Sequence, residues 1–354
     1  MAKGKILMKV TDRRKAKLPD EVKQKYYYPY IFLFLLIGIF LFSFAIGRYP
    51  VPIRLLLKVL FSKILPITKT WSDTIETVVF QIRLPRIIGA MLVGASLSVA
   101  GAVYQGMFKN PLVSPDILGV SAGSAFGASL AIFLSFSTIG IQISSFVFGL
   151  IGVFLAYLIS TKIKEDPLIT LVITGVLVGS IFTSLTSLIK YMADTNDKLP
   201  TITFWLMGSL STITHRDIKT ILLPIAIGMI PLYILKWRLN VLSLNEDEAK
   251  TLGLDTDKLR IVVVICSTLM TAAAVSVSGI IGWIGLVIPH LSRMIVGPDY
   301  RVLLPTTIIL GSSYLLLIDN IARTLTTVEV PLGILTSLIG APFFIFLLLT
   351  NKRS

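Results

Sequence analysis

Apolar runs of roughly 20 residues recur along most of this chain, separated by short polar breaks, and that length of helix is what a hydrocarbon layer about 30 Å thick requires. The short alternation of apolar and polar residues that marks a membrane β-barrel is missing from the sequence. The pattern therefore predicts about ten transmembrane helices. They are expected near residues 28–47, 86–108, 118–136, 144–162, 168–189, 217–237, 259–279, 281–294, 302–323 and 331–350.

Composition agrees with this pattern. Hydrophobic residues make up 54% of the 354 residues, charged residues only 15%, and the mean hydropathy is +0.84, well above the values of a water-soluble domain. We predict an all-α, multi-pass protein of the cell membrane, with one transmembrane domain over residues 28–354 and a basic tail over residues 1–27.

The charge distribution indicates an orientation. The net charge is +14, and nine Lys or Arg residues lie in the first 27, which favours a cytoplasmic tail and a retained first helix. An even number of helices then puts both termini in the cytoplasm, with 21 of the 33 basic residues inside. The alternative for the tail is a nucleic-acid-binding arm, but the other basic residues lie at the ends of apolar runs, so we expect the lipid bilayer and not nucleic acid as the partner.

The segment after the first predicted helix is also basic. It contains VPIRLLLKVLFSK, in which Arg54 and Lys58 are four residues apart on an otherwise apolar surface. This is the pattern of a helix that lies in the membrane interface.

Several features exclude other classes of protein. Glycines recur at four-residue spacing, at 119, 123 and 127 and at 175 and 179, which is typical of close helix packing in lipid. A phosphate-binding GxxxxGK[ST] loop is missing from the sequence, so the chain is not expected to bind ATP itself. One cysteine and two histidines make neither a disulfide nor a metal site, and they supply no catalytic set, so neither an enzyme nor a bound cofactor is expected.

Three stretches carry a family resemblance: RLPRIIGAMLVGASLSVAGAVYQGMFKNPLVSPDILGVSAG (83–123), GWIGLVIPHLSR (282–293) and IGAPFFIFLLL (339–349). In this order they resemble the FecCD-type permeases of ABC importers for iron-siderophores, haem and vitamin B12. The resemblance implies a type II importer permease fold, ATP hydrolysis on two separate ATPase subunits, and an extracytoplasmic substrate-binding protein. It also implies a second permease chain, with a homodimer as the simpler case and a heterodimer as the alternative.

The resemblance further implies a substrate route along the dimer axis, lined mainly by the fifth and tenth helices. The alternative for hydroxyls in membrane helices is a hydrogen bond to backbone or to a neighbouring helix. The candidate lining residues are Thr174, Ser180, Ser184, Thr336 and Ser337.

The segment at about 242–257 resembles the coupling helix that fits into the ATPase subunit. Ser243 or Asn245 suits the start of a short helix, acidic residues suit its first turn, and a glycine suits its end; an ordinary solvated loop is the alternative. The candidate coupling residues are Glu246, Glu248, Ala249, Leu252 and Gly253.

By the same resemblance, Arg83, Arg86 and Arg323 meet acidic residues of the binding protein, since guanidinium groups bind carboxylates in a bidentate manner. The alternative for Arg323 is an ion pair with Asp319, four residues earlier.

Leu168 and Ile169, at the start of the fifth helix, and Pro342, in the tenth, are the candidate gate or hinge residues, with a static kink as the alternative for Pro342.

The sequence therefore predicts the permease subunit of an importer for a metal chelate. A ferric siderophore is the leading expectation for the cargo, while haem, a corrinoid or an oxyanion fits the same family. The rival hypothesis is a proton- or ion-driven transporter, because Asp319 is an intramembrane carboxylate.

Overall fold

Helices make up the regular secondary structure throughout the described part of the chain, with no strand in it. The structure is a computed structural model that describes residues 20–47, 49–63, 65–66, 68–244 and 246–351. Most of the predicted basic tail, residues 1–19, lies outside these ranges.

All ten predicted apolar segments are helical, which confirms the fold class. Among the described residues, seven helical stretches are long and apolar enough to cross a membrane. They contain α2 (Asp20–Ala45), α5 (Leu84–Met107), α7 (Thr138–Ser160), α8 (Pro167–Met192), α10 (His215–Ile234), α13 (Thr256–Ser278) and α15 (Tyr300–Ala322).

Three further helices are apolar but shorter in their apolar part: α6 (Val120–Phe133), α14 (Ile284–Val296) and α16 (Leu332–Asn351). At 1.5 Å per residue, α6 and α14 span only roughly 20 Å, so neither crosses a bilayer of ordinary thickness alone. The remaining short elements are α3 (Ile53–Phe61), α4 (Asp73–Thr77), the π-helical η2 (Val78–Arg83), the 3-10 helix η3 (Pro115–Leu118), α9 (Lys198–Leu206), α11 (Lys236–Leu242) and α12 (Glu246–Thr251).

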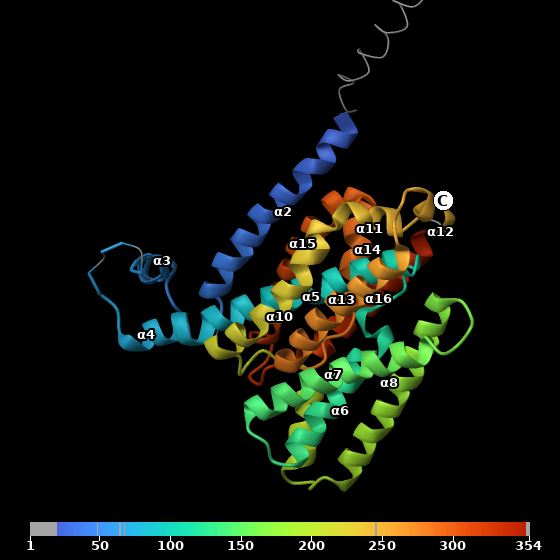
Figure 1. Ribbon diagram of the computed structural model, residues 1–354. Helices are drawn as coiled ribbons and strands as arrows, with labels where there is room; N and C mark the ends of the chain where they lie inside the picture. Colours follow the sequence, from blue (N-terminus) through green and yellow to red (C-terminus); the bar gives the residue numbers. More distant parts are fainter. Residues whose placement is uncertain (1–19, 48, 64, 67, 245, 352–354) are drawn as a thin grey trace, which may run out of the picture.

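The chain passes back and forth between two ends of the bundle. Figure 1 shows α11 and α12 near one end, together with the start of α2 and the end of α16, and α4 near the other. We call these the α12 end and the α4 end. The start of α2 and the end of α16 therefore lie at the same end of the bundle, the α12 end.

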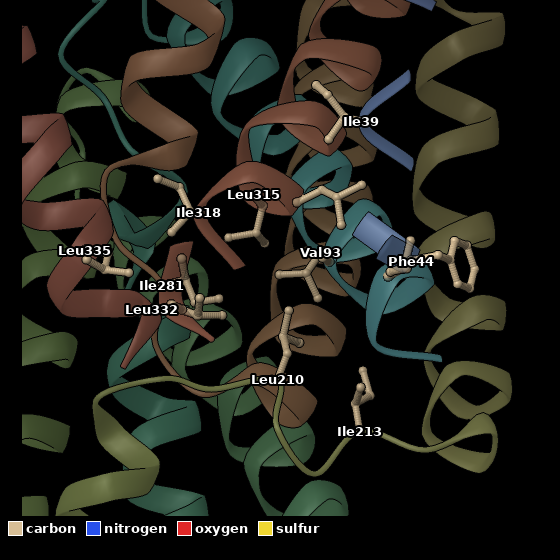
Figure 2. Close-up of a cluster of buried hydrophobic side chains, with 14 of the residues drawn as sticks. Ile39, Phe44, Val93, Leu210, Ile213, Ile281, Leu315, Ile318, Leu332 and Leu335 are labelled. Carbon is tan, nitrogen blue, oxygen red and sulfur yellow. The ribbon is translucent and has the colours of Figure 1, made fainter. Parts of the chain in front are cut away.

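Helix α5 is the centre of the bundle. It packs against α10, α13, α14 and α15, and 83% of its apolar window is buried, compared with 22% for α2 at the periphery. Apolar side chains from α2, α5, α15, α16 and their connections form one cluster near the α4 end, which includes Phe44, Val93, Leu210, Leu315 and Leu332 (Figure 2). Contacts between residues far apart in sequence thus hold α5 in place.

A second group contains α6, α7 and α8, which pack on one another beside α13. A Cβ atom at Gly123 or Gly127 of α6 would lie 2.4 Å from the carbonyl oxygen of Phe148 or Ser144 in α7. The glycine stripe therefore permits close backbone approach, as the spacing predicts.

Candidate translocation site and partner surfaces

A cavity of about 700 Å³ lies where four segments meet: η3, the residues after α9, the α13–α14 connection and α16. It is open to the surface of the chain rather than enclosed, and its lining is mainly apolar with a few polar groups. Ser114, Asp116, Met207, Trp283, Ser337 and Leu338 are among the lining residues. One chain thus forms part of a wall around this space.

Main-chain contacts between three segments hold one side of the cavity. The Ser209 amide donates to the Ser278 carbonyl (2.8 Å), the Leu332 amide to Gly208 (2.9 Å) and the Gly333 amide to Met207 (3.0 Å). We call residues 207–209, 278–282 and 332–333 the backbone junction. A Cβ atom at Gly333 would lie 2.6 Å from the Met207 carbonyl oxygen, so the junction requires a residue without a side chain there.

The five hydroxyls expected in the substrate route have different surroundings. Ser337 lines the cavity and is exposed, while Thr336 beside it is fully buried and bonds to the Gly333 carbonyl (3.2 Å). Thr174 is buried and donates to the carbonyl of Ala156 in α7 (3.0 Å). Ser180 and Ser184 lie on the exposed face of α8. The structure therefore leaves three of the five accessible, one of them in the cavity wall.

Sequence reasoning missed Asp116. This half-buried carboxylate lines the cavity and accepts a hydrogen bond from Ser121 Oγ. The signal was present, because Ser114, Pro115 and Asp116 form a helix-start pattern directly before an apolar run inside the longest of the three family stretches. The segment lies between the helices predicted at 86–108 and 118–136, so the sequence alone assigns it no site.

The α12 end carries a short helix where a coupling helix is expected. Helix α12 ends at Thr251; two residues later Gly253 has a left-handed φ of +76°, and the Leu254 amide donates to the Ala249 carbonyl (3.3 Å). This six-to-one bond past a left-handed glycine is a Schellman C-cap. Ala249 is buried, while Glu248 and Leu252 are exposed; the backbone of Glu246 begins the helix, and its side chain lies outside the described residues.

The next helix, α13, begins directly after this cap. The Asp255 carboxylate accepts from the Lys258 amide (3.1 Å) and pairs with the Lys258 ammonium (2.9 Å). This Lys258 side chain holds the pKa of the Asp255 carboxyl below its usual value. Cap and ion pair together fix the connection between α12 and the bundle.

The three candidate docking arginines are all buried at the α4 end. Arg83 donates to the carbonyls of Phe44 and Tyr49, which ties the connection after α2 to η2. Arg323 donates to the Ser43 carbonyl (2.8 Å) and to Asn320 Oδ1.

Arg86 lies between two carboxylates. It pairs with the fully buried Asp319 (2.9 Å), and its two terminal nitrogens donate to the two carboxylate oxygens of Glu329 (2.9 Å each). Glu329 is 28% exposed and belongs to the segment between α15 and α16. Asp319 also lies 3.8 Å from Arg323, so the intramembrane carboxylate is held by cations of its own chain.

The candidate gate residues lie near the α12 end. The amides of Leu168 and Ile169 donate to Asp166 Oδ1 (2.8 and 3.2 Å), which caps α8. Pro342 is exposed inside α16. Within the described residues no group of three or more His, Cys, Asp or Glu side chains is placed to hold a metal ion.

Comparison with known proteins decides the family. The sequence pattern of the FecCD transport family matches residues 35–350. The chain belongs to the FecCD transport family. Since FecCD proteins are the permease subunits of ABC importers, this chain is a membrane transport component rather than an enzyme, and permeases of this family work with ATPase subunits and a substrate-binding protein.

The FecCD relatives differ in cargo. The molybdate import system permease protein of Haemophilus influenzae is 45% identical over 309 residues, covering 87% of this chain and 91% of that protein. The cobalamin import system permease protein of Halobacterium salinarum is 42% identical over 277 residues, covering 78% and 74%. A transporter described as of the metal-chelate ABC type, solved in an inward-facing conformation, has a TM-score of 0.82 and 42% identity over 91% of this chain and 98% of its own.

Proposed function

We propose that this permease acts as one half of a dimer that carries a metal-bearing solute across the membrane along its two-fold axis. The observation that supports the proposal is the cavity of about 700 Å³, which is open to the surface because the residues of one chain do not enclose it. A second copy facing it would close the route, with a homodimer as the simpler assembly.

The proposed route follows the accessible hydroxyls. Ser337 contributes from the cavity wall, and Ser180 and Ser184 from the exposed face of α8. Thr174 and Thr336 hold the same two helices in place through hydrogen bonds to main-chain carbonyls.

The α12 end is proposed to be cytoplasmic, with the ATPase docked on α12. Leu252 and Glu248 are both exposed, four residues apart. The C-cap of α12 and the N-cap of α13 hold this segment rigidly, so it can fit as a protrusion into a cleft of the ATPase. Movement of the ATPase subunits on ATP binding would then be passed to α13, with the start of α8 at Leu168 and Ile169, and Pro342 in α16, as the gate.

The α4 end is proposed to receive the binding protein. Arg86 is satisfied within the chain by Glu329, so docking through Arg86 requires an acidic residue of the binding protein to replace that partly exposed carboxylate. Arg83 and Arg323 then support the site by fixing the end of α2.

For the cargo we propose a metal chelate, with a ferric siderophore first and haem or cobalamin next. Molybdate is the second candidate, which is favoured by 45% identity over 91% of the molybdate permease. A lining that is mainly apolar with a few polar groups does not distinguish these cargoes, so the cargo has to be measured.

The test uses the permease copurified with its ATPase in proteoliposomes. Binding protein loaded with ferric siderophore, haem, cobalamin or molybdate is added in turn, and ATP hydrolysis and uptake are followed. We expect one cargo to stimulate both.

Coupling through α12 is tested with one variant and its matched control. Leu252→Ala is expected to abolish the stimulation, whereas Leu134→Ala, an equally exposed leucine after α6, is expected to leave it unchanged. Uptake that follows a proton gradient without ATPase, and that is lost in Asp319→Asn, would contradict the ABC mechanism.

A further inference from the structure

Helix α3 begins close to the end of the first membrane span. The first membrane span ends at Ala45, and Arg83 holds the carbonyls of both Phe44 and Tyr49, so the chain has moved little beyond that level when α3 begins at Ile53. Tyr49 is exposed, as aromatic residues at a membrane interface commonly are. Figure 1 shows α3 standing out from the bundle beside α2, where lipid would surround it.

The helix has three distinct faces. Leu56 and Val59 are buried, and α3 contacts α2 and η2. Ile53, Leu57 and Phe61, each four residues apart, form an apolar stripe that is 40–64% exposed. At 100° per residue, Arg54 and Lys58 form a basic stripe directly beside it, away from the buried face.

The two basic residues of α3 differ from their neighbours in having no partner. Lys63 pairs with Glu76 (3.1 Å), and Lys69 with Glu76 (2.9 Å) and Asp73. Within the described residues, neither Arg54 nor Lys58 has an ion pair or a side-chain hydrogen bond, and both are exposed. Two cations one helical turn apart are therefore available to a ligand of opposite charge.

We propose that α3 is a binding site for an anionic phospholipid in the leaflet at the α4 end. Ile53, Leu57 and Phe61 insert among the acyl chains, while Arg54 and Lys58 hold the phosphate and the charged headgroup. The placement of an apolar stripe beside a basic stripe, at the level where a span ends, matches the layered chemistry of that interface. A soluble protein partner would bind the apolar stripe from the aqueous side, and such binding would not require the stripe to lie where a membrane span ends.

The test uses the permease–ATPase complex, stripped of lipid and titrated with phosphatidylglycerol or phosphatidylcholine, with bound lipid counted by native mass spectrometry. We expect phosphatidylglycerol to bind in preference. In Arg54→Gln plus Lys58→Gln its affinity should fall roughly tenfold or more, because each cation near an anionic surface contributes a several-fold effect.

The matched control is Lys63→Gln plus Lys69→Gln, which removes the same charge from cations that are already paired. It should keep the preference. Equal binding of the two lipids by the unaltered complex, or an equal loss in both double variants, would overturn the proposal.

A second measurement places the apolar stripe. A fluorophore on Leu57→Cys, in a chain whose other cysteine is the buried Cys266, should shift to shorter emission wavelength in phosphatidylglycerol vesicles and be quenched by acyl-brominated lipid. A label that remains exposed to water would contradict the lipid proposal. A label that is shielded only when the substrate-binding protein is added would identify that protein, and not a lipid, as the partner of α3.

Discussion

At the residue scale, oxygen atoms of the chain itself accept hydrogen bonds from the buried Arg83, Arg86 and Arg323, although Arg323 Nε has no hydrogen-bond partner among the described residues. Sequence reasoning selected Arg83, Arg86 and Arg323 and weighed a pair between Asp319 and Arg323, which the structure shows at 3.8 Å. The closer partner of Asp319 is Arg86 at 2.9 Å, 233 residues away in the chain. A helix-periodicity rule covers only neighbours three or four residues apart, so that pair became visible only once α5 and α15 were packed together.

Glu329→Gln tests whether Arg86 is a docking group. The amide keeps one hydrogen bond but loses the charge, so we expect the free energy of unfolding to fall by about 1–2 kcal/mol, measured by thermal melting in detergent. Arg86 would then lack the second carboxylate that competes with an acidic residue of the binding protein. We therefore expect the binding protein to bind more tightly, measured as a lower Kd. Glu76→Gln, at an exposed ion pair, is the control for general charge effects. An unchanged or weaker Kd in Glu329→Gln would contradict docking through Arg86.

At the scale of elements, the length of the apolar runs located all ten apolar helices but not their roles. Helix α9 was missed because KLPTITFWL is short, contains Pro200 and carries polar residues on several sides. The inward faces of α8 and α16 were also beyond the sequence, since both helices are apolar all round and a membrane helix has no polar face to mark the solvent. The sequence therefore could not distinguish Thr174 and Thr336, which lie in the packed interior, from Ser337, which lies in the cavity wall.

The backbone junction predicts a sharp difference between two glycine substitutions. Gly333→Ala places a methyl group 2.6 Å from the Met207 carbonyl oxygen, so α16 must shift; we expect a loss of about 1–3 kcal/mol in stability and of most transport. Gly38→Ala in α2 meets no atom within 4 Å and should be neutral or slightly stabilising. Thermal melting and uptake in proteoliposomes measure both. Equal behaviour of the two variants would show that the junction tolerates displacement.

At the scale of the whole molecule, the exposed apolar surface is of two kinds. Part of it must face lipid, as α2 does, and part must face the proposed second copy and the water-filled route. Hydropathy cannot separate these, because lipid and a dimer interface both favour apolar residues. The family resemblance and the helices could be predicted from the sequence, whereas the cavity, the place of Asp116 in its wall and the buried pairing of Arg86 became visible only in the packed chain.

Cysteine accessibility distinguishes the two surfaces. In a Cys266→Ser chain assembled with its ATPase in proteoliposomes, Ser184→Cys and Ser337→Cys are expected to react with a water-soluble maleimide, because both positions would line an aqueous route. Phe34→Cys in α2 is 76% exposed in the chain but should stay unlabelled, since lipid would cover it. Labelling at Phe34 with protection at Ser184 and Ser337 would place the route elsewhere.

The backbone junction bears on how such permeases diverge. Its hydrogen bonds join amides to carbonyls, so they do not depend on side-chain identity, provided that Gly208, Gly279 and Gly333, which leave no room for a Cβ atom, are kept. Proteins that share this framework can drift to quite different cargoes by exchanging a few wall side chains, such as Met207, Trp283 and Ser337, while the architecture that moves stays the same. Relatives named for two different cargoes, molybdate and cobalamin, are each more than 40% identical to this chain, as a common framework with an exchangeable wall would allow.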